Sequence, residues 1–151
     1  MPETVDEAIR VTREDEDYLA ALTMFLDIYG SQVVPIDTPK AARGLSWFGL
    51  SLALIRKEYK AAIDLCRRAI ELEFYNGDHY ANLARVYAAA GKRKKAVETA
   101  ERGLKVARDH EYLHHVRDSL GVRSRPSVPF LDRANPINVS LGQARHAKKK
   151  R

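Results

Sequence analysis

Three histidines in the second half of the chain have the spacing that most resembles a chemical site. His110 and His114 lie four residues apart, which places both on one face of a helix, as metal ligands often are. His115 and Glu111 lie beside them, and Asp118 is the remaining candidate ligand. A third ligand is not evident in this pattern, so we expect no metal site.

No other arrangement of residues predicts catalysis. The sequence has no Gly-rich phosphate loop, no GxSxG nucleophile motif and no zinc-protease motif. Its one cysteine, Cys66, rules out an internal disulfide, and a lone thiol beside scattered histidines is not a nucleophile pair. The acids from Glu14 to Asp17 are typical of a solvated helix start. We therefore predict a protein that is not an enzyme and that needs no cofactor.

The charge of the chain is unevenly distributed around its net value of +6. Residues 1–17 hold seven acids and two arginines, whereas residues 122–151 hold eight lysines and arginines and one aspartate. A basic terminus indicates contact with an anion, such as nucleic acid, an anionic membrane or an acidic protein surface. The acidic start is unlike a signal peptide, and the longest apolar stretch, residues 44–55, is shorter than the about 20 residues of a membrane span. We expect a cytoplasmic protein.

Small and apolar residues return to equivalent positions 34 residues later in the chain. The first set is Tyr59, Ala62, Cys66, Ala69, Ile70 and Leu72, and the second set is Arg93, Ala96, Ala100, Gly103, Leu104 and Val106. A period of this size predicts a helix–turn–helix repeat that stacks on its neighbours. In this pattern Cys66 occupies a helix-packing position, so we predict that it is a small buried residue.

The spacing of apolar residues predicts helices over residues 14–29, 39–56, 59–74, 79–90, 93–108 and 110–120. Thr38, the turn at 76–78 and Asp109 are the expected caps. The helix over 39–56 is apolar nearly all round, so we expect neighbours on several of its sides. The loop over 31–37 is apolar enough to lie against the body. Residues 1–13 are acidic and weakly apolar, and we predict that they are disordered.

These residues resemble the tetratricopeptide repeat family, whose repeat has the same period. Residues 77–110 match it through Tyr80, Leu83, Ala84, Tyr87, Gly91, Ala96 and Gly103, and residues 43–76 match it mainly through Tyr59, Ala62, Ala69 and Leu72. An earlier, degenerate repeat resembles the family through Tyr18, Ala21, Phe25 and Ile28. The resemblance implies an all-α domain over residues 14–121, built as a right-handed superhelix of antiparallel helix pairs. A capping helix at 110–120 and an irregular basic tail at 122–151 would complete the chain.

In this family the first helix of each pair lines a concave groove that holds a peptide. Transferred position by position, the groove residues are Trp47, Ser51, Leu54, Ile55, Asp78, Ala81, Asn82, Arg85, Tyr112 and His115. The resemblance implies an extended or helical peptide as ligand, with Asn82 bonding its backbone. Trp47 is either a groove residue or a core residue, and Arg85 is either a ligand contact or a solvated charge. The family's carboxylate clamp binds acidic chaperone tails, and Asn82 is the one residue of this sequence that corresponds to a clamp residue.

The tail over residues 122–151 contains prolines but is too apolar for an inert linker. Its candidate motif residues are Phe130, Leu131, Asn135, Pro136 and Asn138. Three interpretations remain open. The segment is a linear motif for a partner, or it docks on the repeats of the same or a neighbouring chain, or it is a packed extension. The basic tip is Lys148, Lys149, Lys150 and Arg151, which could contact phosphate through charge but lacks aromatic residues for base stacking.

The leading hypothesis is an adaptor or scaffold that binds a peptide segment of a partner protein in the groove. The C-terminal segment would supply a second contact, and a homo-oligomer is compatible with this reading. The rival hypothesis is a nucleic-acid or ribosome-associated protein anchored by the basic tail. A third is a chaperone for a secreted client protein.

Overall fold

The computed structural model describes residues 4–30 and 39–121, and the regular elements within these ranges are all α-helices. They are α1 (Val5–Arg13), α2 (Tyr18–Gly30), α3 (Pro39–Arg56), α4 (Tyr59–Leu72), α5 (Gly77–Ala89), α6 (Arg93–Val106) and α7 (Glu111–Ser119). The all-α fold expected from the sequence is confirmed. None of these helices is long and apolar enough to cross a membrane. The predicted loop at 31–37, the cap at Thr38 and the tail at 122–151 lie outside the described residues.

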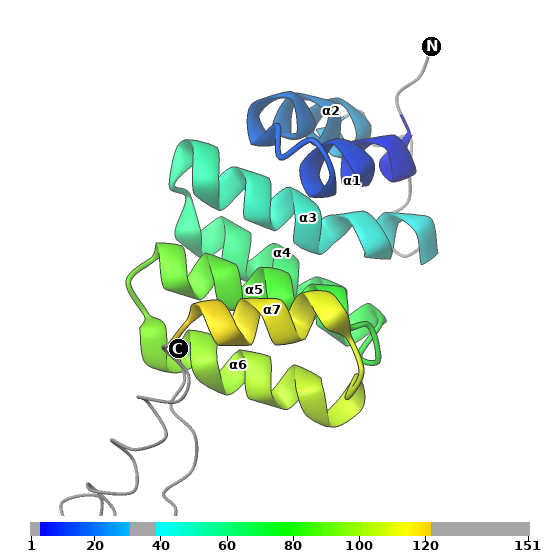
Figure 1. The fold of residues 1–151 in the computed structure, drawn as a ribbon. Helices are drawn as coiled ribbons and strands as arrows, with labels where there is room; N and C mark the ends of the chain where they lie inside the picture. Colours follow the sequence, from blue (N-terminus) through cyan, green and yellow to red (C-terminus); the bar gives the residue numbers. More distant parts are fainter. Residues whose placement is uncertain (1–3, 31–38, 122–151) are drawn as a thin grey trace, which may run out of the picture. The chain divides into compact units, whose positions relative to one another are not determined.

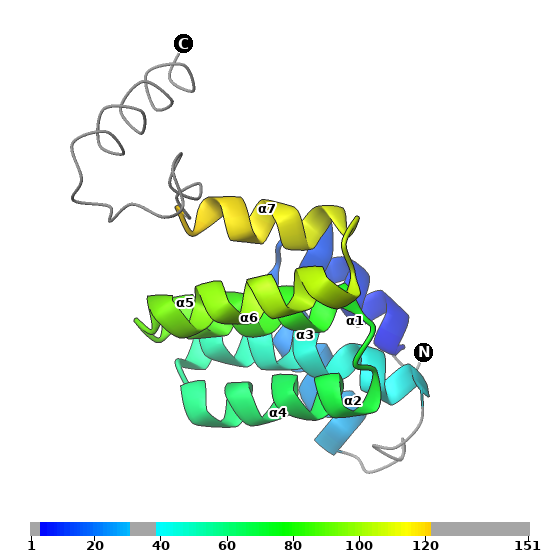
Figure 2. The ribbon, with the colours of Figure 1, turned by 90° about the horizontal axis from the view of Figure 1, so that it is seen from below.

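Successive helices pair in antiparallel fashion, α1 with α2, α3 with α4 and α5 with α6, and α7 packs against α5 and α6 (Figure 1). Helices α1, α3, α5 and α7 lie toward the same side of the stack, α2 and α4 lie behind α1 and α3, and α6 lies beside α5 (Figures 1 and 2). We call the side lined by α1, α3, α5 and α7 the inner face. Helix α3 packs against α1, α2, α4 and α5, as expected for a helix that is apolar nearly all round.

The prediction that residues 1–13 are disordered is wrong, because Val5–Arg13 forms α1. The side chain of Thr4 caps this helix by accepting from the Glu7 N–H at 3.2 Å. Acids in its first turn and arginines in its last turn complement the helix dipole. Its buried residues, Val5, Ala8 and Thr12, are few and small but lie on one helical face. The segment before α3 therefore contains two helices, α1 and α2.

The other helix boundaries differ from the predictions by a few residues at most. Helix α3 covers the predicted range, whereas α2 begins at Tyr18 because Glu14 to Asp17 form the turn from α1. The predicted cap Asp109 is wrong. His110 caps α7 instead, since its Nδ1 accepts from the Leu113 N–H at 3.1 Å. Cys66 is fully buried between helices, as predicted, and this burial raises the pKa of its thiol.

Small residues let neighbouring helices approach closely, as at Gly103 in α6. A Cβ added there would lie 2.5 Å from the Tyr80 Cβ and 2.7 Å from the Leu113 Cδ2. The Tyr80 Cβ is fixed to its own backbone, so it cannot turn aside as the end of a flexible side chain would. The approach of α5 and α7 to α6 thus depends on the missing side chain.

We predict that Gly103→Ala lowers the free energy of unfolding. Overpacking costs about 1–3 kcal/mol, which exceeds the gain of about 0.5–1 kcal/mol that alanine brings to a helix interior. Urea denaturation followed by circular dichroism measures the change. Gly30→Ala is the matched control, because a Cβ at this helix end meets nothing within 4 Å. An equal stability for both variants would contradict the predicted packing.

Candidate functional site

The ten predicted groove residues differ widely in exposure. Trp47, Ser51, Ala81 and Asn82 are buried, Leu54, Asp78, Arg85 and Tyr112 are half-buried, and Ile55 and His115 are exposed. The four buried residues cannot contact a partner, so their assignment to an open groove is wrong. Trp47 is covered by the Tyr112 ring and Asn82 is enclosed by its hydrogen bonds to Ser46 and Tyr112, whereas Ser51 and Ala81 lie in the packed interior.

Asn82 was expected to bond a peptide backbone, but its side-chain amide makes its hydrogen bonds within the fold. Its Nδ2 donates to the Ser46 Oγ at 3.0 Å, and its Oδ1 accepts from the Tyr112 hydroxyl at 2.8 Å. The residue has no exposed surface. One amide therefore ties α5 to both α3 and α7, and it is not available to a ligand.

Tyr112 of α7 closes the inner face above α3. Its ring stacks on the Trp47 ring with centroids 5.5 Å apart and planes 16° from parallel, and Trp47 is 2% exposed. Of the two readings of Trp47, the core residue is correct. The Tyr112 hydroxyl also accepts from Nη1 of Arg85 at 3.2 Å, and Nη2 of Arg85 donates to the Tyr18 hydroxyl at 3.0 Å. Arg85 is thus held rather than freely solvated.

The hydrogen bonds continue from Asn82 and Ser46 into the core. The Ser46 Oγ lies 2.7 Å from Nδ1 of His79, and Nε2 of His79 lies 2.8 Å from Oε1 of Glu73. Burial lowers the pKa of His79, although the hydrogen bond and negative charge of Glu73 act in the opposite direction. We call the connected residues the polar chain, and in order they are Arg85, Tyr112, Asn82, Ser46, His79 and Glu73.

Three members of the polar chain have the composition of a serine-hydrolase triad. Ser46, His79 and Glu73 are connected as a nucleophile, a base and an orienting acid would be. The Ser46 hydroxyl, however, has no exposed surface and also receives the amide of Asn82. A substrate carbonyl cannot reach this oxygen, so the arrangement is structural. Sequence reasoning missed these residues, and the one signal for them was polar side chains on helices that are otherwise strongly apolar.

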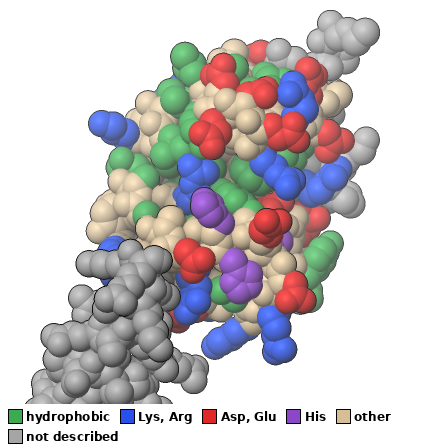
Figure 3. All heavy atoms as spheres, in the orientation of Figure 1, with side chains coloured by type: hydrophobic (Ala, Val, Ile, Leu, Met, Phe, Trp, Pro, Cys, Tyr) green, Lys and Arg blue, Asp and Glu red, His purple; other side chains and the backbone are tan. Residues whose placement is uncertain are grey.

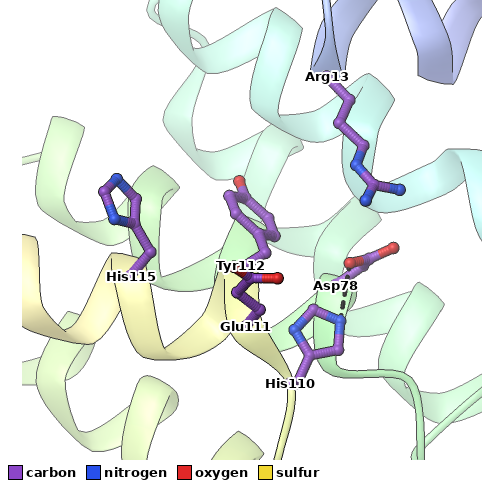
Figure 4. A pocket seen from close by; sticks show the side chains of 6 residues that line it. All are labelled: Arg13, Asp78, His110, Glu111, Tyr112 and His115. Atoms are coloured by element: carbon purple, nitrogen blue, oxygen red, sulfur yellow. Dashed lines mark ion pairs between the residues drawn. The ribbon is translucent and has the colours of Figure 1, made fainter.

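A hollow of about 470 Å³ remains open on the inner face (Figure 4). Its lining side chains come from the end of α1, the start of α5 and the first half of α7, and they are Arg13, Asp78, His110, Glu111, Tyr112 and His115. Asp78, Tyr112 and His115 were predicted groove residues, whereas the other three were not. Histidines lie on this face with acidic and basic side chains around them (Figure 3). The lining is therefore polar and mixed in charge.

The histidine cluster does not converge on one point. Nε2 of His110 pairs with Oδ1 of Asp78 at 2.9 Å, and its Nδ1 caps α7. His114 bonds the Arg108 carbonyl through Nε2, while His115 lines the hollow. Within residues 4–30 and 39–121, no three His, Cys, Asp or Glu side chains are placed to hold a metal ion. The tail motif at 130–138 and the basic tip at 148–151 fall in the part of the chain that the structure does not describe.

Comparison with known protein families places a match on the repeat region. Residues 53–120 match the tetratricopeptide repeat family. This range covers the end of α3 and all of α4 to α7. The resemblance inferred from the sequence is thereby confirmed for these residues. Comparison with curated proteins gave no match.

The buried imidazole of His79 predicts a specific dependence of stability on pH. The folded protein keeps His79 neutral, because burial lowers its pKa, whereas the unfolded chain takes up a proton near the ordinary value of 6.5. Below that pH the unfolded state binds more protons than the folded state, so the free energy of unfolding falls as the pH falls. Above it, this contribution is fully present. Urea denaturation between about pH 8 and about pH 5 measures the effect.

His79→Gln removes the ionisable group, so we expect a smaller loss of stability on acidification, even if the variant is less stable throughout. His115→Gln is the control, since His115 is exposed on the surface of α7 and should leave the dependence intact. The same pH dependence in His79→Gln as in the unmodified protein would show that another group is responsible.

Proposed function

We propose that the inner face, part of which lies in the region 53–120 that matches the tetratricopeptide repeat family, binds a segment of a partner protein at the hollow. Tetratricopeptide repeats generally mediate protein–protein interactions, and proteins of the family are typically scaffolds or adaptors rather than enzymes. The observation that carries the proposal is the hollow itself, which side chains of three helices line without filling. A concave site with a few converging polar groups is the usual form of a ligand site.

The proposed site is smaller than the groove inferred from the sequence. Asp78, Tyr112 and His115 line it directly, and Arg85 adjoins it through the bond to Tyr112. The buried residues Trp47 and Asn82 support its wall from below. Because the wall is held by stacking and hydrogen bonds, a bound segment would meet a surface that loses little conformational freedom on binding.

We propose that residues 122–151 supply a second contact with the same partner. The chain continues from α7 directly into this segment, which carries the apolar pair Phe130 and Leu131 and the basic tip. Eight lysines and arginines against one aspartate would favour a partner with an acidic surface. If the segment binds nucleic acid instead, the interaction should weaken steeply with salt and disappear on nuclease treatment.

Photo-crosslinking tests the site in the full chain. A photoreactive amino acid at position 115 faces the hollow, and the same amino acid at position 114 is exposed on the same helix but does not line it. In native lysate we expect protein adducts from position 115, far fewer from position 114, and no effect of nuclease. Equal adducts from both positions would contradict binding at the hollow.

The contribution of the tail is measured with the same photoreactive chain ending at Gly121. Residues 1–121 form a compact unit by themselves, so this truncation leaves the repeats complete. We expect the adduct from position 115 to persist at several-fold lower yield. An unchanged yield would rule out the second contact, and adducts that nuclease removes would instead identify a nucleic-acid complex.

A further inference from the structure

Arg85 occupies a defined place on the inner face of α5. Its guanidinium lies between the hydroxyls of Tyr18 on α2 and Tyr112 on α7, at 3.0 and 3.2 Å, and 5.6 Å from the centre of the Tyr18 ring. Two tyrosines from different helices therefore fix its orientation. Arg85 is half-buried, unlike a charge that extends into solvent.

The guanidinium has no ionic partner within residues 4–30 and 39–121. Other arginines of these ranges pair with acids, such as Arg10 with Asp15 and Arg43 with Asp6, but no carboxylate lies within 4 Å of Arg85. Tyrosine hydroxyls satisfy hydrogen bonds but carry no charge. A charge that is partly removed from water without a counter-charge is costly in a fold, and an anionic ligand would offset that cost.

The guanidinium also keeps donors for a ligand. It has five N–H groups, and the two tyrosine hydroxyls account for two hydrogen bonds. The described residues contain two buried side-chain polar atoms without a partner, the Ser51 Oγ and the Arg117 Nε, and neither belongs to Arg85. The Nε of Arg85 makes no hydrogen bond among the described residues and is not one of these buried atoms, so this donor is open to solvent and can meet an acceptor.

The tyrosines keep Arg85 charged. Burial alone would lower the pKa of Arg85, but Tyr112 and Tyr18 raise it above its ordinary value. Burial raises the pKa of Tyr112 in turn, so its hydroxyl stays neutral. The group presented at this point of the inner face is a fixed cation at every physiological pH.

We propose that Arg85 is the anchor for an acidic side chain, aspartate or glutamate, of the bound segment. This rests on the proposed function and names the chemistry of its ligand. A guanidinium in a fixed orientation suits a carboxylate, which can accept two parallel hydrogen bonds. The hollow beside Tyr112 is lined by both acids and a cation, Glu111, Asp78 and Arg13, so its charge alone selects no second acid or base. The segment should therefore carry one acid for Arg85 and polar residues for the hollow.

This anchor differs from the carboxylate clamp named for the family. The one clamp counterpart in the sequence, Asn82, is buried and bonded to Ser46 and Tyr112. Arg85 lies three residues further along α5 and is held by hydroxyls. The acid that it binds is a side chain within the segment rather than a chain terminus.

Selection from a random peptide library tests the anchor on the full-length protein. Peptides are selected in parallel on the unmodified protein, on Arg85→Gln and on Arg102→Gln, an exposed arginine of α6 that serves as control. We expect one position to be rich in Asp and Glu with the unmodified protein and the control, and to lose this preference with Arg85→Gln. Thermal unfolding checks that the variants are folded.

Selected peptides are then titrated against the fluorescence of Trp47, the one tryptophan of the chain, which stacks on Tyr112. Changing the peptide's acid to its amide should weaken binding to the unmodified protein about tenfold, and to Arg85→Gln by less than about twofold. Arg85→Lys, which keeps the charge, should lie between them. If Arg85→Gln folds poorly, the acid-to-amide comparison on Arg85→Lys, set against that on the unmodified protein, tests the anchor instead.

Other outcomes overturn the anchor. Peptides without a preferred acid, or an acid that matters equally in Arg85→Gln, would reject the anchor but leave the proposed function standing. Tighter binding when phosphoserine replaces the acid would assign Arg85 to phosphate rather than carboxylate. If no peptide is enriched on the unmodified protein above a blank support, the proposed function fails together with the anchor.

Discussion

The amide of Asn82 is the interaction on which the inner face depends. It donates to Ser46 on α3 and accepts from Tyr112 on α7, and it lies where water cannot replace either partner. Leaving one buried partner without its hydrogen bond costs about 1–3 kcal/mol, a large part of the stability of a small domain. One side chain therefore links three inner helices, in the register that also stacks Trp47 on Tyr112.

This arrangement changes what the inner face can bind. Trp47 and Asn82, which would be free on an open groove, are covered by their contacts with Tyr112 and Ser46, so a ligand meets the hollow and the guanidinium of Arg85 rather than these two side chains. A fully satisfied polar network rigidifies its surroundings. We infer that the inner face is narrower than an open groove but has a fixed geometry. Such a surface favours a ligand with matching charges over a ligand that matches it in shape alone.

The sequence predicted the helices well where burial is regular, and less well elsewhere. Helix α3 was found at its observed limits because it is apolar nearly all round and has a proline at its first position, and the repeat period located α4 to α6. Helix α1 was missed because Val5, Ala8 and Thr12 give a narrow buried stripe amid acids. The site was harder to predict, because Asn82 lies 36 residues from Ser46 and 30 residues from Tyr112 in the sequence. Hydrophobic periodicity locates faces of helices, but it does not show which polar side chains on them bond to one another.

The direction of the hydrogen bonds explains why Arg85 remains without a counter-charge. Arginine can only donate, so Tyr112 accepts from Arg85 and donates to Asn82, which donates to Ser46. An ionised Glu73 can only accept, so neutral His79 carries its proton on Nε2 and receives the Ser46 hydroxyl at Nδ1. Every dipole thus points the same way, from a cation at the surface to an acid in the core, which is the favourable alignment. The charges of Arg85 and Glu73 stabilise the polar chain between them, but its four neutral members keep these two charges apart. An acid that balanced Arg85 directly would have to come from outside the described fold.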